Sequence, residues 1–306
     1  MAGGYRPNGR ACQPIRGPQK APPPGSLAAA DTAAIAAVLR GNCPGRELLY
    51  KRAMTRPHSK RFYKRAEARP AAGLWLYGLH AVKAALANPH RKVSRAVLSE
   101  RAAAEVGPKL LGRVRHELTD PEAVGKLLPP GSVHQGVALA CEPLPRRDLA
   151  DVLVPSGRRR IVLVLDQISD PHNTGAILRS AAAFGVAAVI VQDRHAPPES
   201  GALAKAASGA LDNVPYVQVV NIARALDELA ELGFWRVALT GDGEQNLKDA
   251  ASGGDVAIVL GSEGTGLRRL VRERCDVSAT IPIDAQMESL NVSNAAAIAL
   301  YEIRRE

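Results

Sequence analysis

From residue 161 onward, short apolar runs rich in β-branched residues alternate with segments whose apolar positions recur every three or four residues. The runs predict strands at 161–166, 187–192, 216–220, 235–240, 256–260 and 277–283. The periodic segments predict helices at 174–184, 199–207, 222–232 and 292–304, the third capped by Asn221. Strands that alternate with helices indicate an α/β fold with a mostly parallel sheet covered on both faces.

A smaller α/β unit is predicted before this sheet, at 73–142. Its pattern gives strands at 74–78, 95–99 and 136–141, a helix at 80–87 after Gly78, and helical material at 101–111. A stretch rich in Pro and Arg follows at 143–160, and it is interpreted as the linker to the larger unit at 161–306.

The net charge of +10 is concentrated at the start of the chain. Residues 1–72 contain 14 Lys and Arg but only three acidic residues, whereas 73–306 contain 26 basic and 27 acidic residues. Gly and Pro are dense in this first part, and only 31–40 has a helical pattern. The composition predicts a basic, mostly disordered arm that binds a polyanion; a solubility tail or targeting extension is the alternative.

Length and composition limit the remaining possibilities. The 306 residues allow about two domains, and a hydrophobic content of 46% is enough for packed cores. Without an apolar run of membrane-spanning length or an apolar leader, a cytoplasmic protein is expected. The four cysteines fit no zinc spacing with the histidines and are expected to be reduced; no metal is expected.

Three polar segments follow apolar runs: DPHNTG at 170–175, GSEGTG at 261–266 and SLNVSN at 289–294. In an open α/β sheet, loops that follow strands meet at one edge, where ligands bind. Each segment also has a simpler explanation, since GSEGTG can form a tight turn and SLNVSN can cap the last helix. GSEGTG does not match the dinucleotide fingerprint or the P-loop, so a nucleotide-phosphate site is poorly supported.

Arg179 is predicted to point away from the core, because Ile177, Ala181 and Phe184 form the apolar stripe of its helix. Long helical side chains lean toward the helix amino terminus, which would bring this guanidinium near Asn173 and the positive end of the helix. An anion such as a phosphate would be bound there. A solvated surface arginine is the alternative.

The combination of these segments resembles a known family. DPHNTGAILRSAAAFG at 170–185, LGSEGTGL at 260–267 and IPI at 281–283 with SLNVS at 289–293 are similar to the three motifs of the SPOUT superfamily, and more narrowly of its RNA ribose 2′-O-methyltransferases. YGLHAV at 77–82 and VHQGV at 133–137 resemble the L30e-like RNA-binding domain of bacterial 23S rRNA guanosine-2′-O-methyltransferases. The resemblance covers the chain except for about its first 72 residues.

The resemblance implies a fold and an activity. The fold would carry a carboxy-terminal trefoil knot and form a homodimer, in which the helix at 292–304 fits the interface. The activity would be methyl transfer from S-adenosylmethionine to a ribose 2′-hydroxyl of rRNA. The residues at catalytic motif positions are Arg179, Asn173, Glu263, Ser289 and Asn291. Those at cofactor positions are Gly261, Ile281, Leu290, Thr240, Gly241 and Met287.

Other functions remain open at this point. A tRNA ribose methyltransferase of the same superfamily has the same catalytic motifs, although the L30e-like domain favours rRNA. A non-catalytic RNA-binding or ribosome-assembly protein could keep the fold, but the presence of Arg179, Glu263 and Asn291 together argues for catalysis. An NAD-dependent enzyme would need a glycine fingerprint after its first strand, and the sequence has none.

Overall fold

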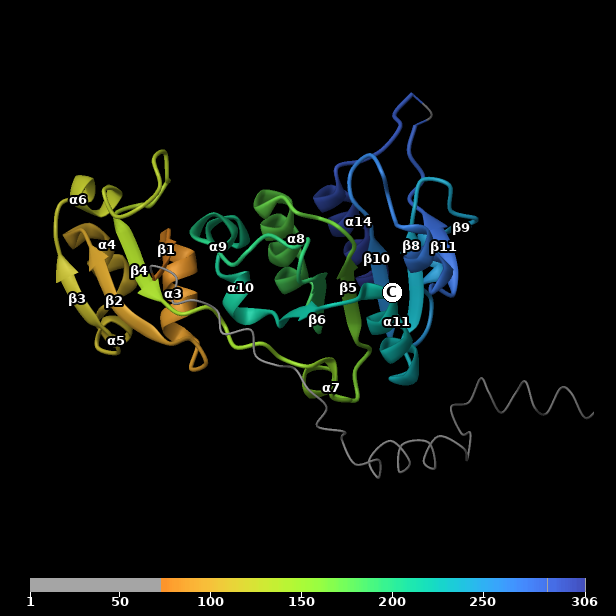
Figure 1. Ribbon diagram of the computed structural model, residues 1–306, viewed down its shortest axis with the longest axis horizontal. Helices are drawn as coiled ribbons and strands as arrows, with labels where there is room; N and C mark the ends of the chain where they lie inside the picture. Colours follow the sequence, from red (N-terminus) through yellow and green to blue (C-terminus); the bar gives the residue numbers. More distant parts are fainter. Residues whose placement is uncertain (1–72, 285, 306) are drawn as a thin grey trace, which may run out of the picture. The chain divides into compact units, whose positions relative to one another are not determined.

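Figure 1 presents the protein as a computed structural model that describes residues 73–284 and 286–305. The predicted basic arm at 1–72, with its helix at 31–40, lies outside the described residues. Contacts divide the chain into a unit at Met1–Glu67 and a second unit at Ala68–Glu306. All of the described residues belong to the second unit.

A seven-stranded sheet forms the larger part of this unit, in the order β7-β6-β5-β10-β8-β11-β9. Every pair of neighbouring strands in it is parallel, which confirms the predicted α/β class. The strands are β5 (Ile161–Leu165), β6 (Ala188–Gln192), β7 (Tyr216–Val219), β8 (Trp235–Leu239), β9 (Gln245–Asn246), β10 (Val256–Leu260) and β11 (Val277–Thr280). Because the strands are parallel, all their carboxyl ends lie at one edge.

Alternate residues of the central strands enter two separate hydrophobic cores. In β5, Ile161, Leu163 and Leu165 belong to one core, and Val162 and Val164 belong to the other. The first core is covered by α8 (Pro171–Ala183), α9 (Gly201–Ala207), α10 (Ala210–Asn213), α12 (Leu247–Ala250) and α14 (Val292–Arg304). The second is covered by α7 (Leu149–Val152), α11 (Ile222–Glu231) and α13 (Arg269–Glu273). The sheet is therefore packed on both faces, as the sequence predicted.

The small region at 74–141 is built on a four-stranded sheet in the order β1-β4-β2-β3. Its strands are β1 (Leu74–Tyr77), β2 (Val93–Leu98), β3 (Arg115–Leu118) and β4 (Val137–Cys141), and its helices are α3 (Leu79–Ala87), α4 (Glu100–Val106), α5 (Pro108–Leu111) and α6 (Pro121–Gly125). Residues of β1, α3 and β4 share the first core with α9 and α10, so the small region and the large sheet are packed together through α9 and α10 (Figure 1).

The long elements lie within three residues of their predicted bounds. The strand predicted at 277–283 ends at Thr280, and two other differences have clear causes. Helix α8 begins at Pro171, three residues before the predicted start, because the Asp170 carboxylate caps it by accepting bonds from the backbone N–H groups of His172 and Asn173. The sequence pattern also failed to predict β3, β9, α6, α7, α10 and α12. Each of these has five residues or fewer, too short to show a hydrophobic period.

The predicted linker at 143–160 is partly ordered against the large sheet. Helix α7 lies within it, and Leu149 and Leu153 are buried in the second core. At its end, Arg160 is buried and pairs with Asp255 at 2.6 Å. The segment therefore packs on the large sheet both at α7 and at its carboxyl end.

Candidate active site

A pocket of about 590 Å³ opens at the carboxyl edge of the large sheet. The loops that follow β8, β10 and β11 form its walls, at residues 240–242, 261–267, 281, 283–284 and 287–290. Ligand-binding sites of open α/β sheets lie at this edge because successive loops converge there. The volume is in the range that holds a small organic ligand.

All six predicted cofactor residues line this pocket: Gly261, Ile281, Leu290, Thr240, Gly241 and Met287. Two of the predicted catalytic residues, Glu263 and Ser289, line it as well. The structure thus gathers eight residues from three loops into one cavity. Their roles in binding and catalysis remain predictions.

The loop at 261–266 is a tight turn that only glycine permits at its ends. Ser262 and Gly266 exchange backbone hydrogen bonds of 3.2 and 2.9 Å, which close the turn. A Cβ atom on Gly261 would lie 2.2 Å from the carbonyl carbon of Gly266, closer than any real contact. Gly264 and Gly266 also have positive φ angles, 87° and 65°, which other residues rarely adopt. The tight-turn interpretation is therefore correct, and the same turn shapes the pocket wall.

One carboxylate joins all three sequence motifs. Glu263 Oε1 accepts hydrogen bonds from Asn173 Nδ2 (3.2 Å), from Asn291 Nδ2 (2.7 Å) and from the backbone N–H of Val292 (3.2 Å). Asn291 Nδ2 also donates to Asn173 Oδ1 at 3.1 Å. We call Asn173, Glu263 and Asn291 the motif network. It confirms that segments separated by 90 and 118 positions converge at one site.

Asn291 has two functions in the structure at once. Its Oδ1 accepts bonds from the backbone N–H groups of Ser293 (2.9 Å) and Asn294 (3.4 Å), which caps helix α14. Its Nδ2 meets Glu263 and Asn173. The capping explanation and the site explanation of this segment are therefore compatible.

Arg179 and Ser289 are not part of the motif network. The Arg179 side chain is exposed on α8, as predicted, and the structure gives it no hydrogen bond or ion pair with another described residue. The structure therefore shows no hydrogen bond between Arg179 and Asn173, which the sequence predicted to lie close together. Ser289 is exposed on the pocket wall and likewise makes no hydrogen bond to a described side chain or backbone group.

An ion pair that the sequence pattern did not predict supports the glycine-rich turn. Asp166 directly follows β5 and is fully buried. It accepts the backbone N–H of Arg268 at 3.1 Å and pairs with the Arg268 guanidinium at 2.6 Å. That guanidinium also donates to Gln192 Oε1 at 2.8 Å. The sequence offered one sign of this ion pair, namely an acidic residue at the end of an apolar strand, because a buried carboxylate needs a partner.

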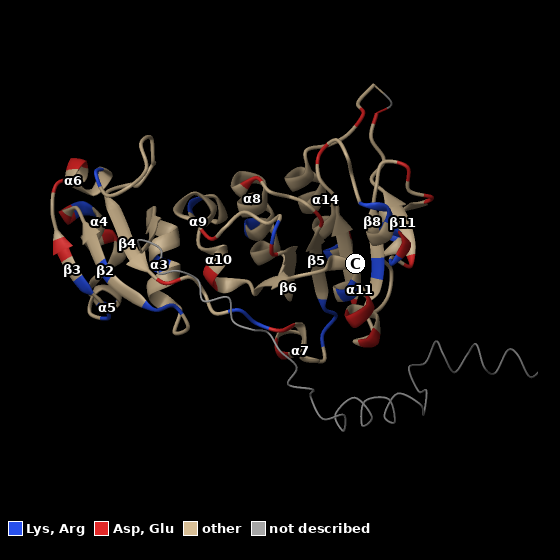
Figure 2. Ribbon diagram, in the orientation of Figure 1, with Lys and Arg blue, Asp and Glu red and all other residues tan. Residues whose placement is uncertain are grey.

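The pocket carries more negative than positive side chains. Among the described residues, Asp242, Glu263, Asp284 and Glu288 line it, and Arg272 is the one cation. Figure 2 shows acidic positions in the loop between β11 and α14. Arg272 is already paired with Asp242 at 2.8 Å, and its hydrogen bond lowers the pKa of the Asp242 carboxyl. This charge balance favours a ligand that brings positive charge.

The fold and the pocket define the class: a parallel α/β protein with a ligand site in the glycine-rich and asparagine-containing loops at its carboxyl edge. The chain belongs to the SpoU rRNA methylase family, which matches residues 160–301. A second family, described as RNA 2′-O ribose methyltransferase substrate binding, matches residues 75–147. We refer to these segments as the methylase region and the substrate-binding region.

Curated relatives match along nearly their whole length. The 23S rRNA (guanosine-2′-O-)-methyltransferase RlmB of Coxiella burnetii is 39% identical over 245 residues, which cover 76% of this chain and 95% of that protein. RlmB of Xylella fastidiosa strain Temecula1 is 41% identical over 246 residues, covering 76% and 96%. The crystal structure of the SpoU methyltransferase AviRb from Streptomyces viridochromogenes, in complex with AdoMet, has the same fold, with a TM-score of 0.66 at 24% identity over 77% of this chain and 90% of AviRb.

Residues 73–284 and 286–305 contain no group of three His, Cys, Asp or Glu side chains placed to hold a metal ion. Among the same residues, no helix has the length and apolarity that crossing a membrane requires.

Proposed function

We propose that this protein transfers a methyl group from S-adenosylmethionine to a ribose 2′-hydroxyl of a guanosine in 23S rRNA. The observation that carries the proposal is the motif network at the lip of the pocket, where Glu263 holds Asn173 and Asn291 together. Family membership and the activity named for the RlmB relatives support the same reaction. The match of the substrate-binding family supports RNA as the substrate.

The residues of the pocket fit S-adenosylmethionine. Ile281, Leu290 and Met287 offer apolar surface for the adenine and thioether parts, and Gly241 has open space where a Cβ would stand. The acidic lining suits the positive sulfonium and amino groups. The AviRb structure was solved with this cofactor, which supports the assignment. We therefore assign Gly261, Ile281, Leu290, Thr240, Gly241 and Met287 to cofactor binding.

The cofactor supplies a methyl group that its positive sulfur already activates. The 2′-oxygen would form a bond to the methyl carbon as the carbon–sulfur bond breaks, S-adenosylhomocysteine would leave, and the hydroxyl proton would pass to a base. Glu263 is the candidate acceptor, directly or through water, since its Oε1 is fixed by three hydrogen bonds and its side chain is exposed to the pocket. Asn173 and Asn291 orient this carboxylate, and Ser289, on the pocket wall, is assigned to contact the ribose.

Arg179 is assigned to the RNA rather than to proton removal. A guanidinium loses its proton only above pH of about 12, so it is a poor base in neutral solution. The exposed side chain has no partner among the described residues, which leaves its donors available for a phosphate or for the developing 2′-alkoxide.

The proposal extends to the fold of each region and to the oligomeric state. It includes a carboxy-terminal trefoil knot around the pocket and an L30e-like fold for the substrate-binding region, as the resemblance of the sequence motifs implies. A homodimer is supported by α14, where Ile298 and Tyr301 are 42% and 55% exposed on a helix whose other face is buried. The basic segment at 1–72 would add contacts to the RNA backbone.

The test is methyl transfer by the purified protein from labelled S-adenosylmethionine to a 23S rRNA transcript, with tRNA as the competing substrate. Nuclease digestion and mass spectrometry should identify 2′-O-methylguanosine in the 23S transcript alone. Transfer to tRNA would move the assignment to the tRNA enzymes, and cofactor binding without transfer to any RNA would support the non-catalytic alternative.

Arg179→Lys tests the assigned role of the arginine. Loss of the forked guanidinium should lower kcat/KM for RNA by about 100-fold while the Kd of S-adenosylmethionine stays within threefold. Arg224→Lys, an exposed arginine on α11 across the sheet, is the matched control and should leave both values unchanged. Retention of most of the rate by Arg179→Lys would reduce its role to simple charge.

A further inference from the structure

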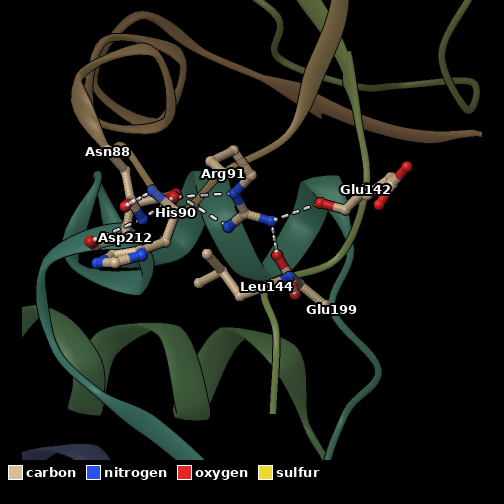
Figure 3. Close-up of polar contacts among 7 residues, drawn as sticks. All are labelled: Asn88, His90, Arg91, Glu142, Leu144, Glu199 and Asp212. Carbon is tan, nitrogen blue, oxygen red and sulfur yellow. Dashed lines mark hydrogen bonds and ion pairs between the residues drawn. The ribbon is translucent and has the colours of Figure 1, made fainter. Parts of the chain in front are cut away.

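A buried arginine connects the substrate-binding region to the methylase region. Arg91 lies between α3 and β2, and its side chain has no solvent exposure. Its Nε and Nη2 donate to the two carboxylate oxygens of Asp212 in α10, at 2.9 and 3.1 Å, and its Nη1 pairs with Glu199 just before α9 (Figure 3). Nη1 also donates to the backbone carbonyl of Glu142 at 3.1 Å. We call Arg91, Glu199 and Asp212 the inter-region cluster.

Neighbouring groups complete the hydrogen bonding of the two carboxylates. Asn88 Nδ2 donates to Asp212 Oδ1 at 3.0 Å, and the backbone N–H of Leu144 donates to Glu199 Oε2 at 2.9 Å (Figure 3). Glu199 thereby binds both Arg91 and the backbone at Leu144, near the end of the substrate-binding region. The cluster therefore joins two places in the substrate-binding region to the methylase region.

The charges in this cluster are balanced rather than isolated. Burial alone lowers the pKa of the Arg91 guanidinium, but hydrogen bonds and charges from Asp212 and Glu199 outweigh it, and the net pKa is raised. The guanidinium therefore stays charged in neutral solution. Loss of one member would leave an unpaired buried charge, whereas an apolar replacement of the whole set is often tolerated.

The backbones of the two regions also approach closely beside the cluster. A Cβ on Gly201 of α9 would lie 2.3 Å from Tyr77 Cε1 and 2.6 Å from the carbonyl oxygen of Trp75 in β1. A Cβ on Gly209 would lie 3.0 Å from the His80 carbonyl oxygen. Such close packing permits only a narrow range of relative positions.

A second polar contact reaches a loop of the substrate-binding region. Lys205 Nζ in α9 donates to Gln135 Oε1, which also accepts the backbone N–H of Leu79 at 3.2 Å. Gln135 has a φ angle of 55°, an uncommon value for a residue with a side chain. Helix α9 of the methylase region thus contacts both the loop at 133–136 and the strand β1.

We propose that the inter-region cluster fixes the substrate-binding region on α9 and α10, so that RNA bound there reaches the pocket at a set distance, with Arg91 as a positioning residue. This inference rests on the proposed RNA methyl transfer. It goes beyond it by naming the residues that couple RNA binding to the site. Arg91 acts through the relative position of two regions and touches neither cofactor nor ribose.

The experiment compares Arg91→Met with wild type in full-length protein. Removing the guanidinium leaves Asp212 and Glu199 unpaired, so hydrogen exchange should rise in α10, in 88–92 and in 142–145. The kcat/KM for the rRNA transcript should fall at least tenfold, mainly through KM, while the Kd of S-adenosylmethionine stays within twofold. Should Arg91→Met prove insoluble, Glu199→Gln, which keeps the size of the side chain, is expected to raise KM for RNA at least threefold.

Two matched variants distinguish positioning from general stability. Arg236→Met breaks a bidentate pair with Asp276 that lies wholly within the methylase region, and it should leave the KM for RNA unchanged. The triple variant Arg91→Met, Glu199→Gln, Asp212→Leu removes the charges together, and kcat/KM for RNA should recover to within threefold of wild type.

The outcomes separate this inference from the proposed function. Unchanged kinetics for RNA in Arg91→Met with raised exchange in α10 would overturn the positioning role. An equal loss of S-adenosylmethionine affinity would also overturn it, because the effect would then be on the pocket itself. Absence of methyl transfer by wild type refutes the proposed function alone. In that case the role of the cluster is tested by the Kd of the rRNA transcript. Arg91→Met should bind the transcript about tenfold more weakly than wild type, and an unchanged Kd would contradict the inference.

Discussion

The motif network at the pocket and the inter-region cluster are both carboxylate networks that connect distant parts of the chain, but their surroundings are opposite. Glu263 is exposed on a glycine-rich turn and shares one oxygen among three donors. Asp212 and Glu199 are 2% and 12% exposed and fully engaged with Arg91. An exposed network keeps capacity for a ligand, while a buried one commits its bonds to the fold.

This difference leads to a general expectation for the methylase region. Buried ion pairs should set the free energy of unfolding and the relative position of elements, with little direct effect on the chemical step. The exposed network should set the rate with little effect on stability. Substitutions in the two kinds of network should separate these effects, from the largest to the smallest.

Asp166→Asn should have the largest effect on stability. Asp166 is fully buried against Arg268, so the amide would leave a partly buried guanidinium without its charge partner. The free energy of unfolding should fall by about 3 kcal/mol in denaturant titration. Glu273→Gln breaks the exposed pair with Arg269 and should change it by less than about 0.5 kcal/mol. Equal effects of the two variants would show that burial does not govern these pairs.

Glu263→Gln should affect the rate without affecting stability. The amide oxygen can still accept from Asn291 and Asn173, but the charge proposed to take up the hydroxyl proton is lost. The kcat should fall about 100-fold, with the Kd of S-adenosylmethionine within threefold and unfolding within about 0.5 kcal/mol. Glu288→Gln, another acid of the pocket wall, is the control and should keep kcat within threefold. An unchanged kcat in Glu263→Gln would assign the proton to water alone.

Gly261→Ala should weaken cofactor binding. The added Cβ would overlap the Gly266 carbonyl carbon at 2.2 Å, so the turn that forms the pocket wall must open. The Kd of S-adenosylmethionine, measured by calorimetry, should rise about 30-fold. Gly254→Ala, where a Cβ meets nothing within 4 Å, should leave the Kd unchanged. A tolerated Gly261→Ala would mean that the turn does not shape the cofactor site.

The pair of Arg236 and Asp276 should contribute to stability in a defined pH range. Burial alone raises the pKa of Asp276, but hydrogen bonds from Arg236 outweigh it and place the folded-state pKa below the ordinary value of 3.8. The pair therefore stabilises the protein above pH 3.8, and this contribution is lost as pH falls through the folded-state pKa. The Tm difference between wild type and Asp276→Asn should be constant from pH 7 to 5 and shrink below pH 3.8. If the Tm difference grew as the pH fell, the predicted direction of the pH dependence would be wrong.

The smallest effect concerns two thiols. Burial raises the pKa of Cys141 and of Cys275 to about 12 in each case, so both are protonated at pH 8. Iodoacetamide at pH 8 should leave these two unlabelled in the folded protein and label them after denaturation, as measured by peptide mass spectrometry. Rapid labelling of Cys141 in Arg91→Met alone would report loosening of the adjacent inter-region cluster.

Much of the fold was predictable because the long elements have a clear hydrophobic period. Strand β10 and helix α14 lie at the predicted residues, 256–260 and 292–304. The short strand β3 was not predictable, since all four of its residues are exposed and it is held by pairing with β2. Helix α7 was missed for a similar reason: it has four residues, and its place depends on Leu149 and Leu153 entering a core formed by distant strands.

The pocket was predictable in its residues but not in its geometry. Glycines around a lone Glu263, and asparagines next to a helix start, are visible as motifs because close backbone approach and capping restrict residue type locally. No local sequence pattern predicts that Glu263 Oε1 accepts hydrogen bonds from both Asn173 and Asn291. Arg179 was placed correctly on an exposed helix face, and its role in the reaction remains a prediction.

The sequence by itself determined the alternation of strands and helices, the position of the three motifs and the uneven charge, since these depend on neighbouring residues and backbone preferences. Only the tertiary structure decided that Arg91 would be paired with Asp212 and Glu199, and Asp166 with Arg268. These partners lie 102 to 121 positions apart, and no local preference selects them. Burial selects them, because a charge removed from water needs an opposite charge that only the folded chain brings within reach.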